Sequence, residues 1–244
     1  MKADRWLVRP QPIARPRLRL FCFPHAGGSP PIFNAWPNYL PANVEVTAVH
    51  LPGRGARFRE PACRRLQPLL QALVGALEPQ LDRPFALFGH SMGALVAFEL
   101  ARALQLRARL PHVLLVAAAP APHLPLVGPP AHELPDTELV AHLQRLNGTP
   151  AELLENEEML SLLLPSLRAD LAVYETYHYQ EAPPLACPIV AFGGQDDEHV
   201  DRAHLAAWKL HTTVGCAVQL FPGDHFFLSN ARPALLQAIA REVE

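Results

Sequence analysis

The chain has 244 residues, half of them hydrophobic, and a formal net charge of −2. This size and composition suit a single α/β domain over residues 1–244, and the small charge argues against nucleic acid as a partner. The longest apolar stretch, Val113–Ala119, is much shorter than the roughly 20 residues of a membrane span. The N-terminus shows no apolar core before a cleavage site, so we expect a cytoplasmic protein with no membrane partner.

Short apolar runs alternate with amphipathic stretches along the chain. The apolar runs predict strands at about 18–23, 44–49, 84–88, 113–118, 187–192 and 217–221. The amphipathic stretches predict helices at about 66–80, 93–106, 200–211 and 233–243. Such βα alternation is typical of a mostly parallel central sheet flanked by helices.

The segment at about 122–182, between the fourth and fifth predicted strands, is too long for an ordinary connection. It predicts amphipathic helices at 136–146, 153–164 and 167–177, separated by residues 147–150 and by Pro165. We interpret this insertion as a helical lid that excludes water and shapes an acyl pocket. The alternative is an appendage that only packs against the domain.

The sequence Gly-His-Ser-Met-Gly at 89–93 lies between the strand predicted at 84–88 and the helix that follows. Gly-x-Ser-x-Gly between a strand and a helix is the nucleophile elbow of the α/β-hydrolase fold. The turn is so tight that only glycine fits at its flanks, and it exposes the hydroxyl of the serine. Ser91 is therefore the candidate nucleophile, whereas His90 is interpreted as a packed residue of the elbow rather than a second base.

The partners of the serine are expected after later strands, in the order acid and then histidine. The strand at 187–192 ends in a loop that contains Asp196 and Asp197, and the strand at 217–221 is followed by His225. His225 would accept the Ser91 proton as general base, and one aspartate would orient its imidazole. On the residues alone, the two adjacent aspartates compete for that task.

Two backbone amides must face the negative oxygen that develops during attack on a carbonyl. Met92, the residue after the nucleophile, supplies one of them. The second is expected in the loop His-Ala-Gly-Gly at 25–28, after the first predicted strand, and we place it on Ala26. The alternative is a glycine-rich turn without a catalytic part, and His25 is interpreted as a structural loop residue.

Arg54 and Arg57 lie in the loop after the strand at 44–49, on the carboxyl edge where sites of α/β proteins lie. They are candidate substrate-entrance contacts for an anionic group, and the alternative is a solvated loop. No metal is expected, because the four cysteines show neither a Cys-x-x-Cys pair nor metal-ligand spacing. We expect buried free thiols instead, above all at Cys22 and Cys187 in predicted core strands.

Seven ordered motifs resemble the type II thioesterase family, the discrete thioesterases that accompany nonribosomal peptide synthetases and polyketide synthases. The motifs are FPHAGG at 23–28, FNAWP at 33–37, LPGRGAR at 51–57, GHSMGA at 89–94, LRAD at 167–170, FGGQDD at 192–197 and GDHFFL at 223–228. The similarity covers nearly the whole chain and includes the lid segment LNGTP at 146–150.

The resemblance implies hydrolysis of stalled or wrong acyl groups from the phosphopantetheine arm of carrier proteins. It places the acid on the second aspartate of its loop, Asp197, the nucleophile on Ser91, the base on His225 and the oxyanion amides on Ala26 and Met92. The resemblance also implies that the partners are acyl- or peptidyl-carrier proteins, and we expect a monomer that needs no cofactor of its own.

Two other enzymes are compatible with these motifs. A medium-chain acyl-carrier thioesterase of fatty acid synthesis shares all of them and differs in pocket depth. A general carboxylesterase shares only the elbow and the triad, and it would hydrolyse oxygen esters at least as well as thioesters. A third alternative, a carrier-binding protein with an inactive site, is disfavoured because all three triad roles are filled.

Overall fold

Seven strands form one sheet in the computed structural model, which describes residues 5–126, 128–146 and 156–244. The strand order is β1-β3-β2-β4-β5-β6-β7, and every neighbouring pair is parallel except β1 with β3. The strands are β1 Leu7–Val8, β2 Leu18–Phe23, β3 Val44–Val49, β4 Phe85–His90, β5 Leu114–Ala117, β6 Ile189–Gly194 and β7 Cys216–Phe221. The predicted fold, a mostly parallel sheet flanked by helices, is confirmed.

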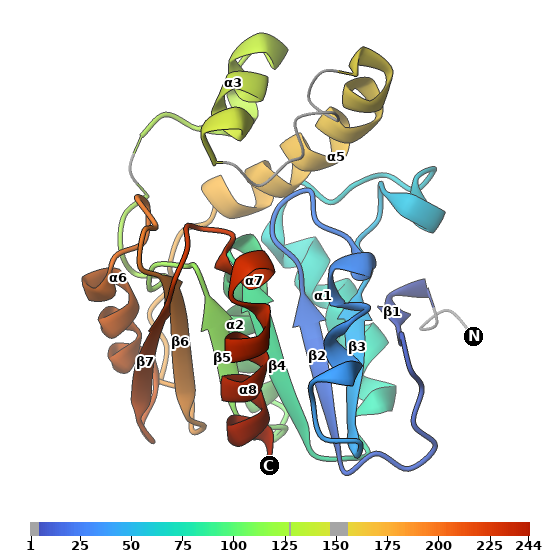
Figure 1. Ribbon diagram of the computed structural model, residues 1–244, viewed down its shortest axis with the longest axis vertical. Coiled ribbons are helices and arrows are strands. Elements are labelled where there is room, and N and C mark those ends of the chain that lie inside the picture. Colours follow the sequence, from blue (N-terminus) through green and yellow to red (C-terminus); the bar gives the residue numbers. More distant parts are fainter. Residues whose placement is uncertain (1–4, 127, 147–155) are drawn as a thin grey trace.

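Helices cover both faces of the sheet (Figure 1). Helices α1 (Leu66–Leu77) and α2 (Met92–Gln105) contribute to one core, and α8 (Arg232–Val243) contributes to the other. All residues of the central strands β4, β5 and β6 are buried. Near-continuous apolar strands are the pattern that a parallel sheet covered on both faces requires.

Three short elements differ from the prediction or were not predicted. The stretch predicted as one helix at 200–211 is α6 (Arg202–Ala206) followed by a 3₁₀ turn at Ala207–His211. Asp201 starts α6 because its side chain accepts from the amide of His204 at 2.9 Å. The short helix α7 (Phe227–Asn230) and the two-residue strand β1 carry too little periodicity to be predicted.

Two helices between β5 and β6 form what we call the cap: α3 (Asp136–Leu146) and α5 (Glu157–Glu175). Figure 1 shows the cap above the carboxyl ends of the central strands. Leu139 and Leu143 of α3 pack with Leu164 and Leu167 of α5 in a small core of their own. The predicted break at 147–150 and the predicted helix start at 153 lie outside the described residues.

The prediction that Pro165 separates two helices is wrong. Helix α5 runs through Pro165 without a break, from an N-cap at Asn156, whose side chain accepts from the Met159 amide at 3.0 Å. A proline inside a helix removes one backbone hydrogen bond. Burial of Leu164 and Leu167 on either side of Pro165 supplies packing that favours the continuous helix. Among the described residues, no helix is both long and apolar enough to span a membrane.

Candidate active site

Ser91 lies in a strained turn between β4 and α2. Its backbone has φ 55° and ψ −120°, a conformation that a non-glycine residue adopts only where its surroundings impose it. The Ser91 amide donates to the carbonyl of Ala117 on β5 at 2.8 Å. A Cβ on Gly89 would lie 2.1 Å from the Gly93 carbonyl oxygen, and a Cβ on Gly93 would lie 2.2 Å from that of Phe23. Both glycines are thus required by close backbone approach.

Ser91, His225 and Asp197 form one hydrogen-bonded chain. His225 Nδ1 lies 2.9 Å from Asp197 Oδ2, and His225 Nε2 lies 3.1 Å from Ser91 Oγ. A carboxylate only accepts, so Nδ1 carries the proton and Nε2 is free to accept from the serine hydroxyl. The structure thus brings together three side chains that the sequence places on three separate loops, in the tautomer that a general base needs.

Backbone pairing between the loops after β6 and β7 selects Asp197 over Asp196. The amide of Gln195 donates to Phe221 and that of Asp196 donates to Gly223, which aligns the two loops. Asp196 is exposed, whereas the Asp197 side chain is fully buried. Oδ1 of Asp197 accepts from the amides of His199 and Val200 at 2.9 and 3.1 Å. The acid therefore has a fixed orientation before any substrate binds.

The pKa of Asp197 is lowered by its partners. Burial alone would raise this pKa, but the hydrogen bond and charge of His225 and the two backbone amides favour the carboxylate more strongly. Asp197 is therefore ionised at neutral pH and can stabilise an imidazolium at His225.

Two further histidines lie against the His225 loop. His90 Nε2 contacts the His225 carbonyl at 2.9 Å, and because a carbonyl only accepts, Nε2 is the donor. His90 Nδ1 then accepts from His25 Nδ1 at 3.2 Å. Burial is the main cause of a lowered pKa in both rings, to about 4 for His25 and well below 6.5 for His90. Both rings are neutral and structural, and His90 holds the backbone of the proposed base.

In the loop after β2, the amides of Gly27 and Gly28 already have acceptors within the protein. The Gly27 amide donates to Asp170 Oδ2 at 2.8 Å and the Gly28 amide to the His25 carbonyl at 2.9 Å, so neither is available to an oxyanion. The predicted donor, Ala26, directly precedes them. The Met92 amide is the first of α2, where no intrahelical acceptor exists. A Cβ on Gly93 would also lie 2.6 Å from the Pro24 carbonyl, so this loop packs directly on the elbow.

The predicted entrance role is wrong for Arg54 and Arg57. Both residues are buried, at 7% and 6% exposure, so the alternative of a solvated loop is wrong as well. Arg54 forms a bidentate pair with Asp170, and Arg57 bonds to Glu60 and to the His50 carbonyl. Guanidinium groups with internal partners at 2.6 to 3.1 Å are not available to a substrate phosphate. The sequence shows the charges but not the acceptors that neutralise them.

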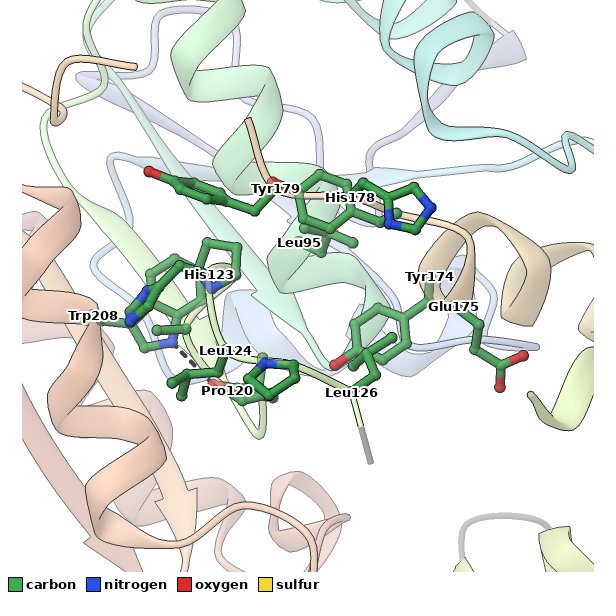
Figure 2. A pocket seen from close by; sticks show the side chains of 15 residues that line it. Leu95, Pro120, His123, Leu124, Leu126, Tyr174, Glu175, His178, Tyr179 and Trp208 are labelled. Atoms are coloured by element: carbon green, nitrogen blue, oxygen red, sulfur yellow. Dashed lines mark hydrogen bonds between the residues drawn. The ribbon is translucent and has the colours of Figure 1, made fainter. Parts of the chain in front are cut away.

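A cavity of about 440 Å³ lies between the start of α2, the segment after β5 and the end of α5 (Figure 2). Its wall includes Leu95, four residues after Ser91, together with Leu124 and Tyr174. Trp208 closes one side, where its indole Nε1 donates to the Ala119 carbonyl at 2.9 Å. Tyr174, at the end of the cap helix α5, is a lining residue that no sequence motif indicated.

The cysteines and the other residue types that bind metals form no disulfide and no metal site among the described residues. All four cysteines are free, and Cys22 and Cys187 are buried as expected, while Cys63 and Cys216 are partly exposed. Burial raises the pKa of Cys187 to about 11, so this thiol is not a nucleophile at neutral pH. Within residues 5–126, 128–146 and 156–244, no cluster of three or more His, Cys, Asp or Glu is arranged to hold a metal ion.

The sheet order, the elbow after β4 and the two loops after β6 and β7 define a protein of the α/β-hydrolase class. The model of the thioesterase domain family matches residues 18–243, and the chain belongs to this family. The predicted resemblance to type II thioesterases is confirmed by individual relatives and solved structures.

Two curated relatives and one solved structure illustrate the similarity. Linear gramicidin dehydrogenase LgrE of Brevibacillus parabrevis is 46% identical over 240 residues, which span 97% of this chain and 91% of the relative. Gramicidin S biosynthesis protein GrsT of Aneurinibacillus migulanus is 38% identical, over 99% of this chain and 95% of its own. The type II thioesterase BorB from the borrelidin biosynthetic cluster superposes with a TM-score of 0.92 at 38% identity, over 99% and 98% of the two chains.

Proposed function

We propose that this protein is a serine thioesterase that removes acyl groups from the phosphopantetheine arm of carrier proteins, as an editing enzyme of a nonribosomal peptide or polyketide pathway. The observation that carries the proposal is the contact of His225 with both Ser91 and Asp197 at the carboxyl edge of the sheet. Membership in the thioesterase family and similarity to BorB support the thioester as substrate.

The proposed mechanism uses Ser91, His225 and two backbone amides, with Asp197 orienting His225 throughout. Ser91 Oγ attacks the thioester carbonyl while His225 Nε2 takes its proton, and the amides of Ala26 and Met92 bind the resulting oxyanion. The carbon–sulfur bond then breaks, the pantetheine sulfur leaves with the proton from His225, and the acyl group stays on Ser91. Water, deprotonated by His225, attacks this ester. The bond from the acyl carbon to Ser91 Oγ then breaks, His225 returns the proton to Oγ, and the carboxylic acid leaves.

The acyl group is assigned to the cavity lined by Leu95, Leu124 and Tyr174. This assignment is supported by Leu95, a wall residue one helical turn after Ser91 on α2, and by the predominance of apolar and aromatic side chains in the wall. The cap helix α5 contributes Tyr174 to that wall, which supports the lid role proposed for the insertion. A long arm that reaches Ser91 from the carrier then leaves the acyl group between cap and sheet.

The name of LgrE denotes a dehydrogenase, and that activity is not extended to this chain. The nucleophile, base and acid are arranged here for acyl transfer, and they supply each proton transfer that thioester hydrolysis needs. The GrsT and BorB relatives favour an editing thioesterase over a fatty-acid enzyme or a general carboxylesterase.

The test is deacylation of a carrier protein loaded with a short acyl-phosphopantetheine, followed by intact mass. We expect rapid loss of the acyl mass with the wild type, and a loss of kcat on the order of 10⁴-fold or more for Ser91→Ala. Ser229→Ala, an exposed serine close to His225 in the sequence, is the matched control and retains activity. Turnover of a simple oxygen ester without carrier deacylation would instead identify a general esterase.

A further inference from the structure

A buried ion pair lies directly behind the loop that carries the Ala26 amide. Arg54 and Asp170 are 7% and 3% exposed, and they are 116 residues apart in the chain. Arg54 NH1 lies 2.6 Å from Asp170 Oδ2, and NH2 lies 2.7 Å from Oδ1, which is the bidentate geometry of a strong arginine–carboxylate pair. One partner follows β3 and the other lies on the cap helix α5.

The pair bonds to the loop at two backbone groups, one on each side of the peptide group that links Gly27 to Gly28. Asp170 Oδ2 accepts from the Gly27 amide at 2.8 Å, and Arg54 NH1 donates to the Gly28 carbonyl at 2.9 Å. The peptide that links Ala26 to Gly27 is therefore fixed through its N–H. Since the Ala26 amide belongs to the preceding peptide, its direction depends on the same two bonds.

Helix α5 also packs against the glycine at the centre of this loop. Gly27 has φ +77°, in the left-handed region, and its prospective Cβ would lie 3.0 Å from Leu167 Cδ1 of α5. Helix α5 thus contacts the loop through Leu167 and, one turn later, through Asp170. Arg54 Nε has no hydrogen-bond partner among the described residues, so the hydrogen bonds of this guanidinium are all directed at Asp170 and Gly28.

We propose that Arg54 and Asp170 are positioning residues of the oxyanion hole, which keep the Ala26 amide aimed at the oxygen that becomes negative during attack by Ser91. The inference rests on the proposed acyl-transfer function. Neither residue contacts the proposed reacting atoms, so they act on the oxyanion through the Ala26 amide. Preorganised donors act through their fixed direction, and loss of a single oxyanion donor costs about 10²–10³-fold in kcat.

The first variants keep the size of the side chains. Asp170→Asn replaces one acceptor oxygen by an NH₂ group, which then faces either the Gly27 amide or Arg54, donor against donor. Arg54→Lys keeps the charge but cannot span both Asp170 oxygens and the Gly28 carbonyl. We expect kcat to fall about 10–100-fold in Asp170→Asn and less in Arg54→Lys, with an unchanged KM.

A second readout separates positioning from general damage. A trifluoromethyl ketone adds to Ser91 and forms a tetrahedral oxyanion, so its inhibition constant should rise by the same factor as kcat falls. A smaller fraction of folded enzyme would lower the apparent kcat without raising this inhibition constant. Glu45→Gln is the matched control. It removes the charge of another buried carboxylate, which pairs with Arg19 at the amino ends of β2 and β3, whereas the active-site loops follow the carboxyl ends of the strands.

A double substitution covers the case in which a single variant fails to fold. Arg54→Met with Asp170→Leu removes both charges together, which avoids an unpaired buried charge, and it still leaves the Gly27 amide without its acceptor. Near wild-type kcat in this folded double variant, or an inhibition constant that stays unchanged while kcat falls, would overturn the proposal. All variants are also assayed on a p-nitrophenyl ester, so that failure of carrier deacylation by the wild type contradicts only the proposed function.

Discussion

The two sides of the active site are built in different ways. On the triad side, Ser91, Asp197 and His225 each follow a strand, and backbone bonds between neighbouring strands and loops bring them together. On the oxyanion side, the loop after β2 is held by Arg54 from another loop and by Asp170 from the cap helix α5. The positions of the three proposed triad side chains thus depend on the sheet, whereas the loop of the proposed oxyanion hole depends on a buried ion pair and on a helix of the insertion.

The largest effect on kcat is expected from a substitution on the triad side, at Asp197. Asp197→Asn should lower kcat by about 10⁴-fold, because the amide cannot orient His225 in the correct tautomer or stabilise its cation. Steady-state kinetics on the acyl-carrier substrate measures the change. Asp196→Asn is the matched control: it is adjacent, exposed and expected to change kcat by no more than about twofold. A large loss in Asp196→Asn alone would show that the acid is wrongly assigned.

The junction of the two sides is the next place to test. Gly93→Ala would place a Cβ 2.2 Å from the Phe23 carbonyl and 2.6 Å from that of Pro24. Backbone atoms cannot move aside as a side chain can, so we expect the free energy of unfolding to fall by about 3 kcal/mol or more. Urea denaturation provides the measurement.

Its control is Gly75→Ala on the exposed side of α1, where an added Cβ meets no atom within 4 Å. That change should raise the free energy of unfolding by about 0.5–1 kcal/mol, because alanine favours the helix. Equal effects of the two substitutions would mean that the close approach of the elbow to the oxyanion loop has no energetic weight.

The smallest expected effect is on the pH dependence of stability, to which His25 on the oxyanion side contributes. His25 in the oxyanion loop has a pKa lowered to about 4, mainly by burial and then by the charges of His225 and Arg54. Between about pH 4 and 6.5 the unfolded chain binds more protons at this residue than the folded chain, so stability rises with pH across the window. Each such histidine contributes a slope of at most about 1.4 kcal/mol per pH unit.

Urea unfolding at several pH values in that window measures the slope, and His25→Asn should reduce it. His90 and His211 also have pKa values lowered chiefly by burial, the latter to about 4, so part of the slope remains in the variant. Asp197 contributes with the same sign, but its stabilisation is present above its ordinary pKa of 3.8 and is lost only below it. An unchanged slope in His25→Asn would mean that His25 is not buried as a neutral ring.

Much of the triad side could be predicted from local pattern. Short apolar runs that end in Gly-x-Ser-x-Gly, in an aspartate loop and in a histidine loop locate Ser91 and His225 without any tertiary information. The choice of Asp197 over Asp196 needed the family resemblance, because it depends on which carboxylate the paired loops after β6 and β7 bury. Pro165 was misread because packing of the cap core outweighs the local preference of proline for a helix end.

The sequence by itself determined six of the strands, the elbow and the chain order of the proposed triad residues, since each follows from periodicity and steric demands within a few neighbouring residues. Only the tertiary structure decided that Arg54 and Arg57 are buried, that Asp170 accepts from the Gly27 amide in the loop after β2, and that Tyr174 and Leu95 line one cavity. Whether a charge is solvated or paired depends on acceptors that lie, in the case of Arg54 and Asp170, 116 residues away. A local sequence pattern cannot indicate a partner so far away in the chain, because burial and pairing arise only when the chain is packed.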